Sequence, residues 1–248
     1  MKLKFYFDEA WRWPLAGPVV VWCLVPLTSF DNSIFKDSKK LTEKKRLVLF
    51  DQIQELEKNN KLLFSYGFAT NVEIDNFGIS KSINIATKRA LLIIILKYIY
   101  FIEDKIWINW DQLLNIQKIK KQIDKIYHDE NKIYDYDFSK IIKILNNIEK
   151  IHWIIFDGNV DFWLSKDLWF KVISIIKWDD KVPYIWWASI VAKVVRDTYI
   201  VNKSKEFPEY GFEKHKWYGT KLHRENIKKY GLSSFHRKSF CRNIVENS

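Results

Sequence analysis

Four acidic residues lie at the ends of segments that have the composition of β-strands. Asp8 and Glu9 follow the first apolar run of the chain, Asp157 ends a later run, and Asp179 follows the next one. Strand ends form the ligand-binding crevice of open α/β sheets, and carboxylates gathered there repel one another unless a hard divalent cation lies between them. The four acids are therefore predicted to be both the catalytic residues and the ligands of Mg²⁺ or Mn²⁺. Each acid alone would more often be a solvated turn residue, so the prediction depends on their meeting in space.

The charge balance indicates what such a metal site would act on. Lys and Arg outnumber Asp and Glu by 41 to 30, which gives a net charge of +11. The stretch 211–240 holds eight Lys or Arg and two Glu. A strongly basic surface favours nucleic acid as the partner, with an anionic membrane surface as the weaker option. Two metals about 4 Å apart activate a water and stabilise the leaving oxygen at a phosphate, so the predicted reaction is phosphodiester hydrolysis.

Elements that could position these acids alternate along the chain, which predicts the α/β class. Apolar runs predict strands at 3–7, 18–27, 62–70, 153–159 and 172–176. Helical periodicity predicts a helix that begins after the N-cap Thr42 and further helices at 82–102 and 189–203. The segment of about 103–150 is rich in Ile, Lys and Asn, and it is expected to form an inserted helical hairpin.

Composition sets the class of the whole chain. With 248 residues and 48% hydrophobic content, the chain can bury a full core. Cys23 and Cys241 lie far apart, no signal peptide is visible, and every apolar run is shorter than the roughly 18 residues of a membrane span. We therefore expect a cytoplasmic protein with a catalytic domain at 1–205 and a basic helical extension at 206–248.

Several motifs in one order resemble ribonuclease HII. They are Asp8-Glu-Ala-x-Arg-x-Pro-Leu-Ala-Gly-Pro-Val19, Asp37-Ser-Lys-Lys-Leu-Thr-Glu-Lys-Lys-Arg46, Phe156-Asp-Gly-Asn159, Lys177-x-Asp179, Ala188-Ser-Ile-Val-Ala-Lys-Val-Val-Arg-Asp197, Tyr210-Gly-Phe-Glu-Lys-His-Lys-x-Tyr-Gly-Thr220 and His236-Arg-Lys-Ser-Phe240. The resemblance covers nearly the whole chain except the segment of about 103–150.

The resemblance implies a ribonuclease H-like fold, with a mixed central sheet flanked by helices and a helical C-terminal extension. It also implies an endonuclease that cuts RNA–DNA hybrids and incises 5′ to single ribonucleotides in duplex DNA, using two divalent ions, as a monomer. The catalytic acids of the family match Asp8, Glu9, Asp157 and Asp179. Its ribose-reading Gly-Arg-Gly element matches Trp11, Arg12 and Trp13, and its sugar-packing tyrosine matches Tyr218. Expected phosphate contacts are Lys39, Lys40, Lys177 and Lys216, while His215, His223 and His236 meet phosphate or have no role.

Tryptophan replaces glycine where this chain departs from the family pattern. Trp11, Trp13, Trp178 and Trp217 stand at glycine positions, and Trp22, Trp186 and Trp187 stand where glycine or another small residue is expected. The chain has twelve Trp and seven Gly, and together they reach the ordinary glycine level of about 7%. One hypothesis is that UGA codons read as glycine in the source are written here as Trp. The alternative is a genuine Trp-rich relative whose indoles block the ribose pocket.

Three functions therefore stay open at this point. The first is the metal-dependent endoribonuclease. The second is a catalytically silent nucleic-acid-binding protein, which applies if the tryptophans are real. The third, another nuclease of the ribonuclease H-like class such as a junction resolvase, does not explain the motif around Tyr218 or the lysine-rich segment after Asp37.

Overall fold

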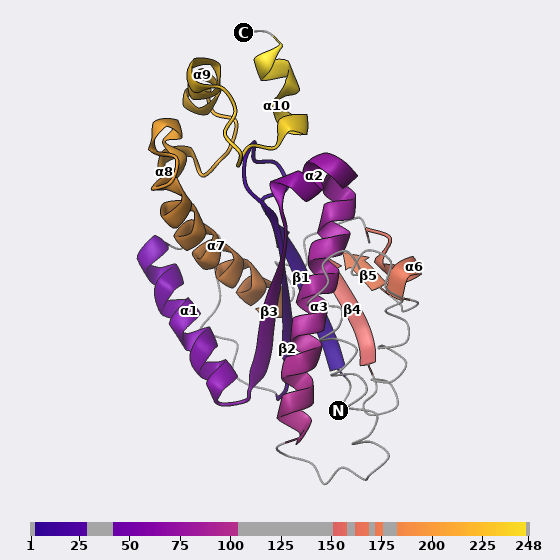
Figure 1. Cartoon of the computed structure of the whole chain (residues 1–248). Helices are drawn as coiled ribbons and strands as arrows, with labels where there is room; N and C mark the ends of the chain where they lie inside the picture. Colours follow the sequence, from indigo (N-terminus) through magenta and orange to yellow (C-terminus); the bar gives the residue numbers. More distant parts are fainter. Residues whose placement is uncertain are drawn as a thin grey trace.

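A computed structural model describes residues 3–28, 42–103, 151–157, 162–168, 172–175 and 183–246. In chain order the strands are β1 (Leu3–Ala10), β2 (Val19–Pro26), β3 (Leu62–Ala69), β4 (Ile151–Asp157) and β5 (Val172–Ile175). The helices are α1 (Glu43–Lys58), α2 (Asn71–Phe77), α3 (Ile79–Glu103), α6 (Leu164–Leu168), α7 (Pro183–Ser204), η5 (Pro208–Tyr210), α8 (Phe212–His215), α9 (Lys221–Tyr230) and α10 (Lys238–Val245). Figure 1 shows their arrangement.

The five strands form one mixed sheet in the order β3-β2-β1-β4-β5. Strands β1, β2 and β3 pair antiparallel as a meander, whereas β4 runs parallel to both β1 and β5. The centre of the sheet is thus β1, whose C-terminal end lies beside that of β4. This mixed sheet with helices on both faces confirms the expected fold class.

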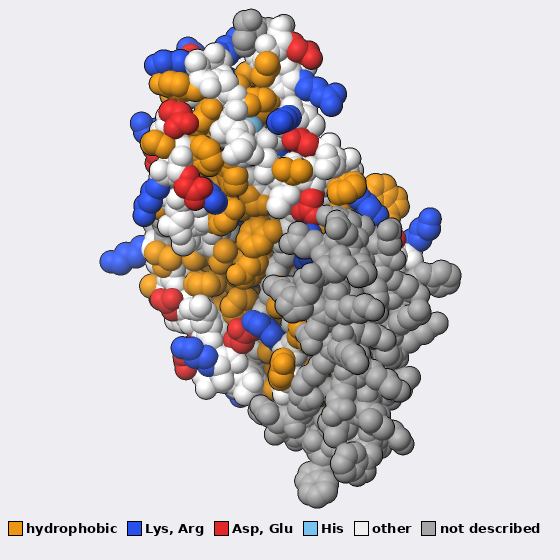
Figure 2. Space-filling view, in the orientation of Figure 1, with side chains coloured by type: hydrophobic (Ala, Val, Ile, Leu, Met, Phe, Trp, Pro, Cys, Tyr) orange, Lys and Arg blue, Asp and Glu red, His pale blue; other side chains and the backbone are white. Residues whose placement is uncertain are grey.

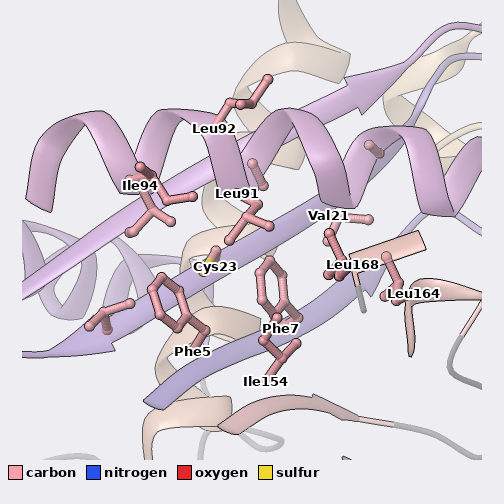
Figure 3. Packing of buried hydrophobic residues seen from close by; sticks show 14 of the residues in the cluster. Phe5, Phe7, Val21, Cys23, Leu91, Leu92, Ile94, Ile154, Leu164 and Leu168 are labelled. Atoms are coloured by element: carbon pink, nitrogen blue, oxygen red, sulfur yellow. The ribbon is translucent and has the colours of Figure 1, made fainter. Parts of the chain in front are cut away.

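Strand β2 shows how the sheet acquires two buried faces. Val19, Val21 and Cys23 belong to the core between the sheet and α3, whereas Val20 and Trp22 belong to the core on the opposite face, which α7 covers. Successive residues of a strand point to opposite faces, so a continuous apolar run is what a strand buried on both sides requires. Figure 3 shows the first of these cores, where side chains of β1 and β2 meet those of α3.

The predicted elements are largely confirmed, and their ends show the main differences. Thr42 caps α1, and its hydroxyl accepts a hydrogen bond from the Lys45 N–H at 3.4 Å. Strand β1 continues three residues beyond the predicted end at Phe7, because its antiparallel pairing with β2 extends to Ala10. The predicted hairpin in 103–150 lies outside the described residues.

The C-terminal helices α8, α9 and α10 lie together at one end of the sheet (Figure 1). Their buried side chains, including Phe212, Ile227 and Ile244, belong to the same hydrophobic core as α7 and β2. Asp75 of α2 accepts hydrogen bonds from the backbone N–H groups of Lys238 and Ser239, at 2.9 and 2.8 Å. The C-terminal helices therefore pack into the same core as the sheet.

On the face shown in Figure 2, the basic side chains do not form a single patch. Lysine and arginine lie around the rim among acidic side chains, and hydrophobic side chains form a band down the middle of this face. Among the described helices, none is long and apolar enough to cross a membrane.

Candidate active site

The sheet places three of the four expected acids at one edge. The parallel pairing of β1 with β4 ends at Phe7 and Phe156, and Asp8 and Asp157 are the next residues of these strands. Glu9 follows on β1, and its backbone N–H donates to Asp8 Oδ1 at 2.8 Å. Because both strands run in the same direction, their carboxyl ends meet at the same sheet edge.

A pocket of about 310 Å³ opens at this edge. Its lining combines the end of β1, the loop that follows it, one face of α7 and the turn before α9. The lining residues are Asp8, Glu9, Ala10, Trp11, Arg12, Trp13, Ala192, Lys193, Arg196 and Tyr218. Five expected site residues besides Asp8 are thus brought together. A second pocket of about 210 Å³, between α1 and α7, has none of the expected residues in its described lining.

Two cations of α7, Lys193 and Arg196, line the pocket although they were not predicted as site residues. They lie three positions apart, so both fall on the helix face that is turned toward the acids. The sequence did contain a signal, because both belong to the family-like block 188–197, but which face of the helix meets the site depends on tertiary packing. Asp197 holds the Arg196 side chain through a 2.8 Å hydrogen bond from Nε.

Arg12 provides a third cation at the mouth of the pocket. Its guanidinium lies 3.8 Å from the Glu9 carboxylate and 5.3 Å from the centre of the Trp13 ring. The Trp13 side chain is 70% exposed. The lining of the pocket thus combines two carboxylates with three cations, a set of groups suited to a metal-bridged phosphate.

Tyr218 lies on the turn between α8 and α9, and this turn is connected to the loop after β1. The Leu15 N–H donates to the Trp217 carbonyl at 2.9 Å, and the Tyr218 N–H donates to the His215 carbonyl at 3.0 Å. The Tyr218 ring is 41% exposed, so it is available to a ligand in the pocket.

The structure does not place the remaining expected residues in the pocket. Lys39, Lys40, Lys177 and Asp179 lie outside the described residues, as does the side chain of Asp157. Lys216 is described, and it lies at the C-cap of α8 rather than in the lining of the pocket.

The donor set fits a hard divalent cation as far as it is described. Asp8 and Glu9 offer adjacent carboxylates at the strand end, and oxygen ligands of this kind suit Mg²⁺ or Mn²⁺. Among the described side chains, no three His, Cys, Asp or Glu groups form a complete metal site. The described part therefore supplies one half of the expected ligand set.

Trp11 lines the pocket, but most of its indole, which was expected to occupy the ribose pocket, is buried below the loop. Only 3% of Trp11 is exposed, and its ring packs 4.8 Å from the Trp217 ring in the core beneath the loop. The backbone of both residues is left-handed, with φ of 71° at Trp11 and 68° at Trp217. This region of φ is costly for bulky side chains and open to glycine. The two positions thus have the backbone that their family pattern requires.

The three histidines of the C-terminal region are buried, so in this structure they do not face phosphate. His223 and His236 are 0% and 1% exposed, and their Nε2 atoms lie 3.1 Å apart. His236 Nδ1 accepts from the Ser233 N–H, so its Nε2 donates to His223, whose Nδ1 then donates to the Tyr218 carbonyl at 3.0 Å. Burial, assisted by the neighbouring His215, lowers the pKa of His223 to about 3 and that of His236 to about 4. The histidines are neutral at pH 7 and hold the turn that carries Tyr218.

The ribonuclease HII family model matches residues 7–134 and 97–243 of the chain. The chain belongs to the ribonuclease HII family. Both matched ranges extend into the segment 103–150, for which we expected no counterpart in the family. This membership makes the chain a nuclease of the ribonuclease H type, and it places the pocket at Asp8 and Glu9 in a nucleic-acid hydrolase.

Relatives from several bacteria are similar over nearly the whole chain. Ribonuclease HII of Treponema denticola is 34% identical over 234 residues, which cover 94% of this chain and 95% of the relative. Ribonuclease HII of Fusobacterium nucleatum is 35% identical over 242 residues, covering 96% and 86%. The crystal structure of ribonuclease H2 from Pyrococcus horikoshii aligns with a TM-score of 0.56 at 22% identity, covering 99% of this chain and 98% of that one. This structure supports the fold.

Proposed function

We propose that this chain is an endoribonuclease that hydrolyses the RNA strand of RNA–DNA hybrids and incises 5′ to single ribonucleotides in duplex DNA. The observation that carries the proposal is the pocket that joins Asp8 and Glu9 to Arg12 and Tyr218. It combines a metal-binding edge with a phosphate-binding cation and an exposed ring that can pack on a sugar. The similarity to ribonucleases HII supports the same reaction.

Asp8, Glu9, Asp157 and Asp179 would hold two divalent ions, and these ions supply an activated water and stabilise the leaving oxygen when bound. A ribonuclease HIII from the solved structures is described in complex with Mn²⁺, which supports Mn²⁺ as one usable ion. The carboxylate pair on β1 contributes adjacent oxygen donors on a rigid strand. A site on a paired strand keeps its geometry better than a site on a loop.

The other pocket residues have separate roles in the proposal. Arg12, Lys193 and Arg196 contact the phosphates on either side of the cut, where they offset charge that the metals leave uncompensated. Tyr218 packs on the sugar that follows the ribonucleotide. Lys39, Lys40, Lys177 and Lys216 stay predicted phosphate contacts along the rest of the duplex.

Replacing Asp8 tests the function. Asp8→Asn removes one metal-binding carboxylate oxygen, so we expect cleavage of a duplex with one ribonucleotide to fall on the order of 10²–10³-fold in Mg²⁺ or Mn²⁺. Binding to the duplex should change less than about threefold, because basic side chains supply most of the affinity. Asp51→Asn, on the exposed face of α1, is the matched control. Both changes are made in the form of the protein that cuts, and cleavage by Asp8→Asn at the rate of that parent would contradict the proposal.

The second candidate function, a silent nucleic-acid-binding protein, requires the tryptophans to be real. Two observations favour glycine at Trp11 and Trp217 instead. Both have left-handed backbones, and within the described part of the chain the buried indole N–H of each has no hydrogen-bond partner. A buried unpaired donor costs about 1–3 kcal/mol. Trp163, for which no family counterpart was evident, also has a left-handed φ, of 62°.

The identity of these residues can be measured on the protein purified from the organism that encodes it. Peptide masses should show glycine at positions 11 and 217, and the gene should carry UGA there. UGG codons, or peptides that contain Trp at both positions, would favour the silent protein. We call the version with all twelve Trp replaced by Gly the glycine form.

A further inference from the structure

Arg237 is a buried cation in the C-terminal extension that reaches the loop after β1. The residue is 0% exposed, and it is not part of the pocket lining. Its guanidinium donates to four backbone carbonyls of the loop 11–18. These bonds are Nη2 to Trp11 at 2.7 Å, Nη1 to Arg12 at 3.2 Å, Nε to Gly17 at 2.8 Å and Nη2 to Pro18 at 2.8 Å.

The surroundings of Arg237 contain little negative charge to offset its own. Among the described residues no carboxylate forms an ion pair with it, and Asp75, the acid that acts on it most strongly, already accepts the N–H groups of Lys238 and Ser239. Burial lowers the pKa of Arg237 to about 9, with Asp75 opposing the shift, so the group is still charged at pH 7. A buried charge without a counterion is costly unless its hydrogen bonds are satisfied. The carbonyls of the loop accept these hydrogen bonds.

The backbone near Arg237 is joined to the same loop. The Arg237 N–H donates to the Leu15 carbonyl at 2.8 Å, and the Gly17 N–H donates to the Phe235 carbonyl at 2.9 Å. The loop carries Arg12 and the two flanking positions into the pocket. Its shape therefore depends on a side chain that is more than two hundred residues away in the sequence.

We propose that Arg237 is a positioning residue, which acts on the nuclease reaction by fixing the backbone of the loop 11–18 against the pocket. This inference rests on the proposed function. The planar guanidinium suits the task because its five N–H groups point in fixed directions and reach several carbonyls at once. A lysine ammonium keeps the charge but lacks this fork, so it cannot hold both ends of the loop.

Two substitutions at Arg237 and two at a control site test the proposal. Arg237→Lys keeps the charge, and Arg237→Gln keeps part of the donor set without charge. Arg242→Lys and Arg242→Gln make the same changes at an exposed arginine of α10. Hydrogen exchange is read at the amides of Leu15 and Gly17, which pair with Trp217 and Phe235, and in β2 as the internal reference.

We expect both Arg237 variants to exchange at Leu15 and Gly17 at least about tenfold faster, with exchange in β2 within about twofold of the parent. In the form of the protein that cuts, kcat should fall about 10²-fold, since small misplacements of a positioned group have effects of this size. The Kd for the duplex should change less than about threefold. The Arg242 variants should match the parent in every readout.

Unchanged exchange at Leu15 and Gly17 in both Arg237 variants would overturn the proposal. Equal loss of protection throughout the sheet would also overturn it, because Arg237 would then support the fold as a whole rather than the loop. If neither the printed chain nor the glycine form cuts any substrate, the proposed function fails, whereas the exchange result still decides what Arg237 holds.

Discussion

Two sets of buried N–H groups lie on the side of the sheet that α7 covers, and they differ in how they are paired. In the polar set, the guanidinium of Arg237 reaches four carbonyls, and His223 and His236 bond to each other and to the backbone. In the indole set, Nε1 of Trp11, Trp22 and Trp217 has no partner within the described part of the chain. Phe212 contacts both sets, with its ring 6.1 Å from Trp217 and 5.6 Å from His223.

The difference between the sets separates residues that fit their surroundings from residues that do not. Buried polar groups in native proteins are nearly always hydrogen-bonded. Arg237, His223 and His236 follow this rule although they are hard to bury, whereas Nδ1 of the adjacent His215 has no partner among the described residues. The indoles break the rule, and at Trp11 and Trp217 the backbone is also left-handed, which is costly for a bulky side chain. This side of the core thus contains a hydrogen-bonded network and, next to it, two indoles, of Trp11 and Trp217, on a backbone that does not suit them.

Removing indoles one at a time gives the largest expected effect. Trp22 lies within β2 and is 1% exposed, so Trp22→Gly made alone, in the printed chain whose core is packed around the indoles, leaves a cavity and should lower the free energy of unfolding by about 3–5 kcal/mol. Trp11→Gly should cost about 1–2 kcal/mol less, because glycine relieves the left-handed backbone. Urea unfolding of both variants measures the difference. Equal losses at the two positions would show that the Trp11 backbone is not strained.

Breaking the histidine pair should have a smaller effect. His236→Leu leaves the Ser233 N–H without its acceptor and His223 Nε2 without its donor, which should cost about 1–3 kcal/mol of unfolding free energy. Arg242→Leu, on the exposed face of α10, serves as the control and should stay within about 0.5 kcal/mol. An equal loss in the two variants would contradict a specific role for the network.

Lowering the pH should reduce the unfolding free energy of the unsubstituted protein, because the same two histidines bind protons on unfolding. Their folded pKa values, about 3 for His223 and about 4 for His236, lie below the ordinary 6.5, so the unfolded chain binds more protons between about pH 6.5 and about pH 4. Stability therefore falls as the pH falls, by up to about 1.4 kcal/mol per pH unit for each histidine. Urea unfolding across this range should give a shallower slope in His236→Leu. Identical slopes would mean that these histidines titrate normally.

Removing the exposed ring should leave the network intact. The His223 bond is to the Tyr218 carbonyl, which Tyr218→Ala retains, so the unfolding free energy should change by less than about 0.5 kcal/mol. The preference for a duplex with one ribonucleotide over an all-DNA duplex should fall about tenfold, in line with about 1–3 kcal/mol for stacking on an aromatic ring. Competition binding measures this preference, and an unchanged preference would remove Tyr218 from the contact surface.

Much of the fold was predictable because buried strands and helices have recognisable local patterns of apolar residues. The continuous apolar run in 18–27 and the acids after apolar runs indicated buried strands that end at a site. The short helix α2 was missed, although Thr70 and Glu73 form a capping box at its start, because its few apolar residues give no clear period. Short elements of this kind are defined by their caps and their packing rather than by periodicity.

The site was predictable in part and for a different reason. That Asp8 and Glu9 lie together at a strand end, where they line the pocket, could be predicted from residue type and strand position. The inward rotation of Trp11 could not, because it depends on a left-handed backbone and on the space beside Trp217. The role of Arg237 could not either, since its four acceptors lie at the other end of the chain.

The most direct measurement is cleavage of a DNA duplex that carries one ribonucleotide, in Mg²⁺ or Mn²⁺, by the printed chain and by the glycine form. We expect the glycine form to cut on the 5′ side of the ribonucleotide and the printed chain to cut far more slowly. Equal cleavage by both forms would contradict the assignment of glycine at the pocket positions. No cleavage by either form would contradict the nuclease function and favour the silent nucleic-acid-binding protein.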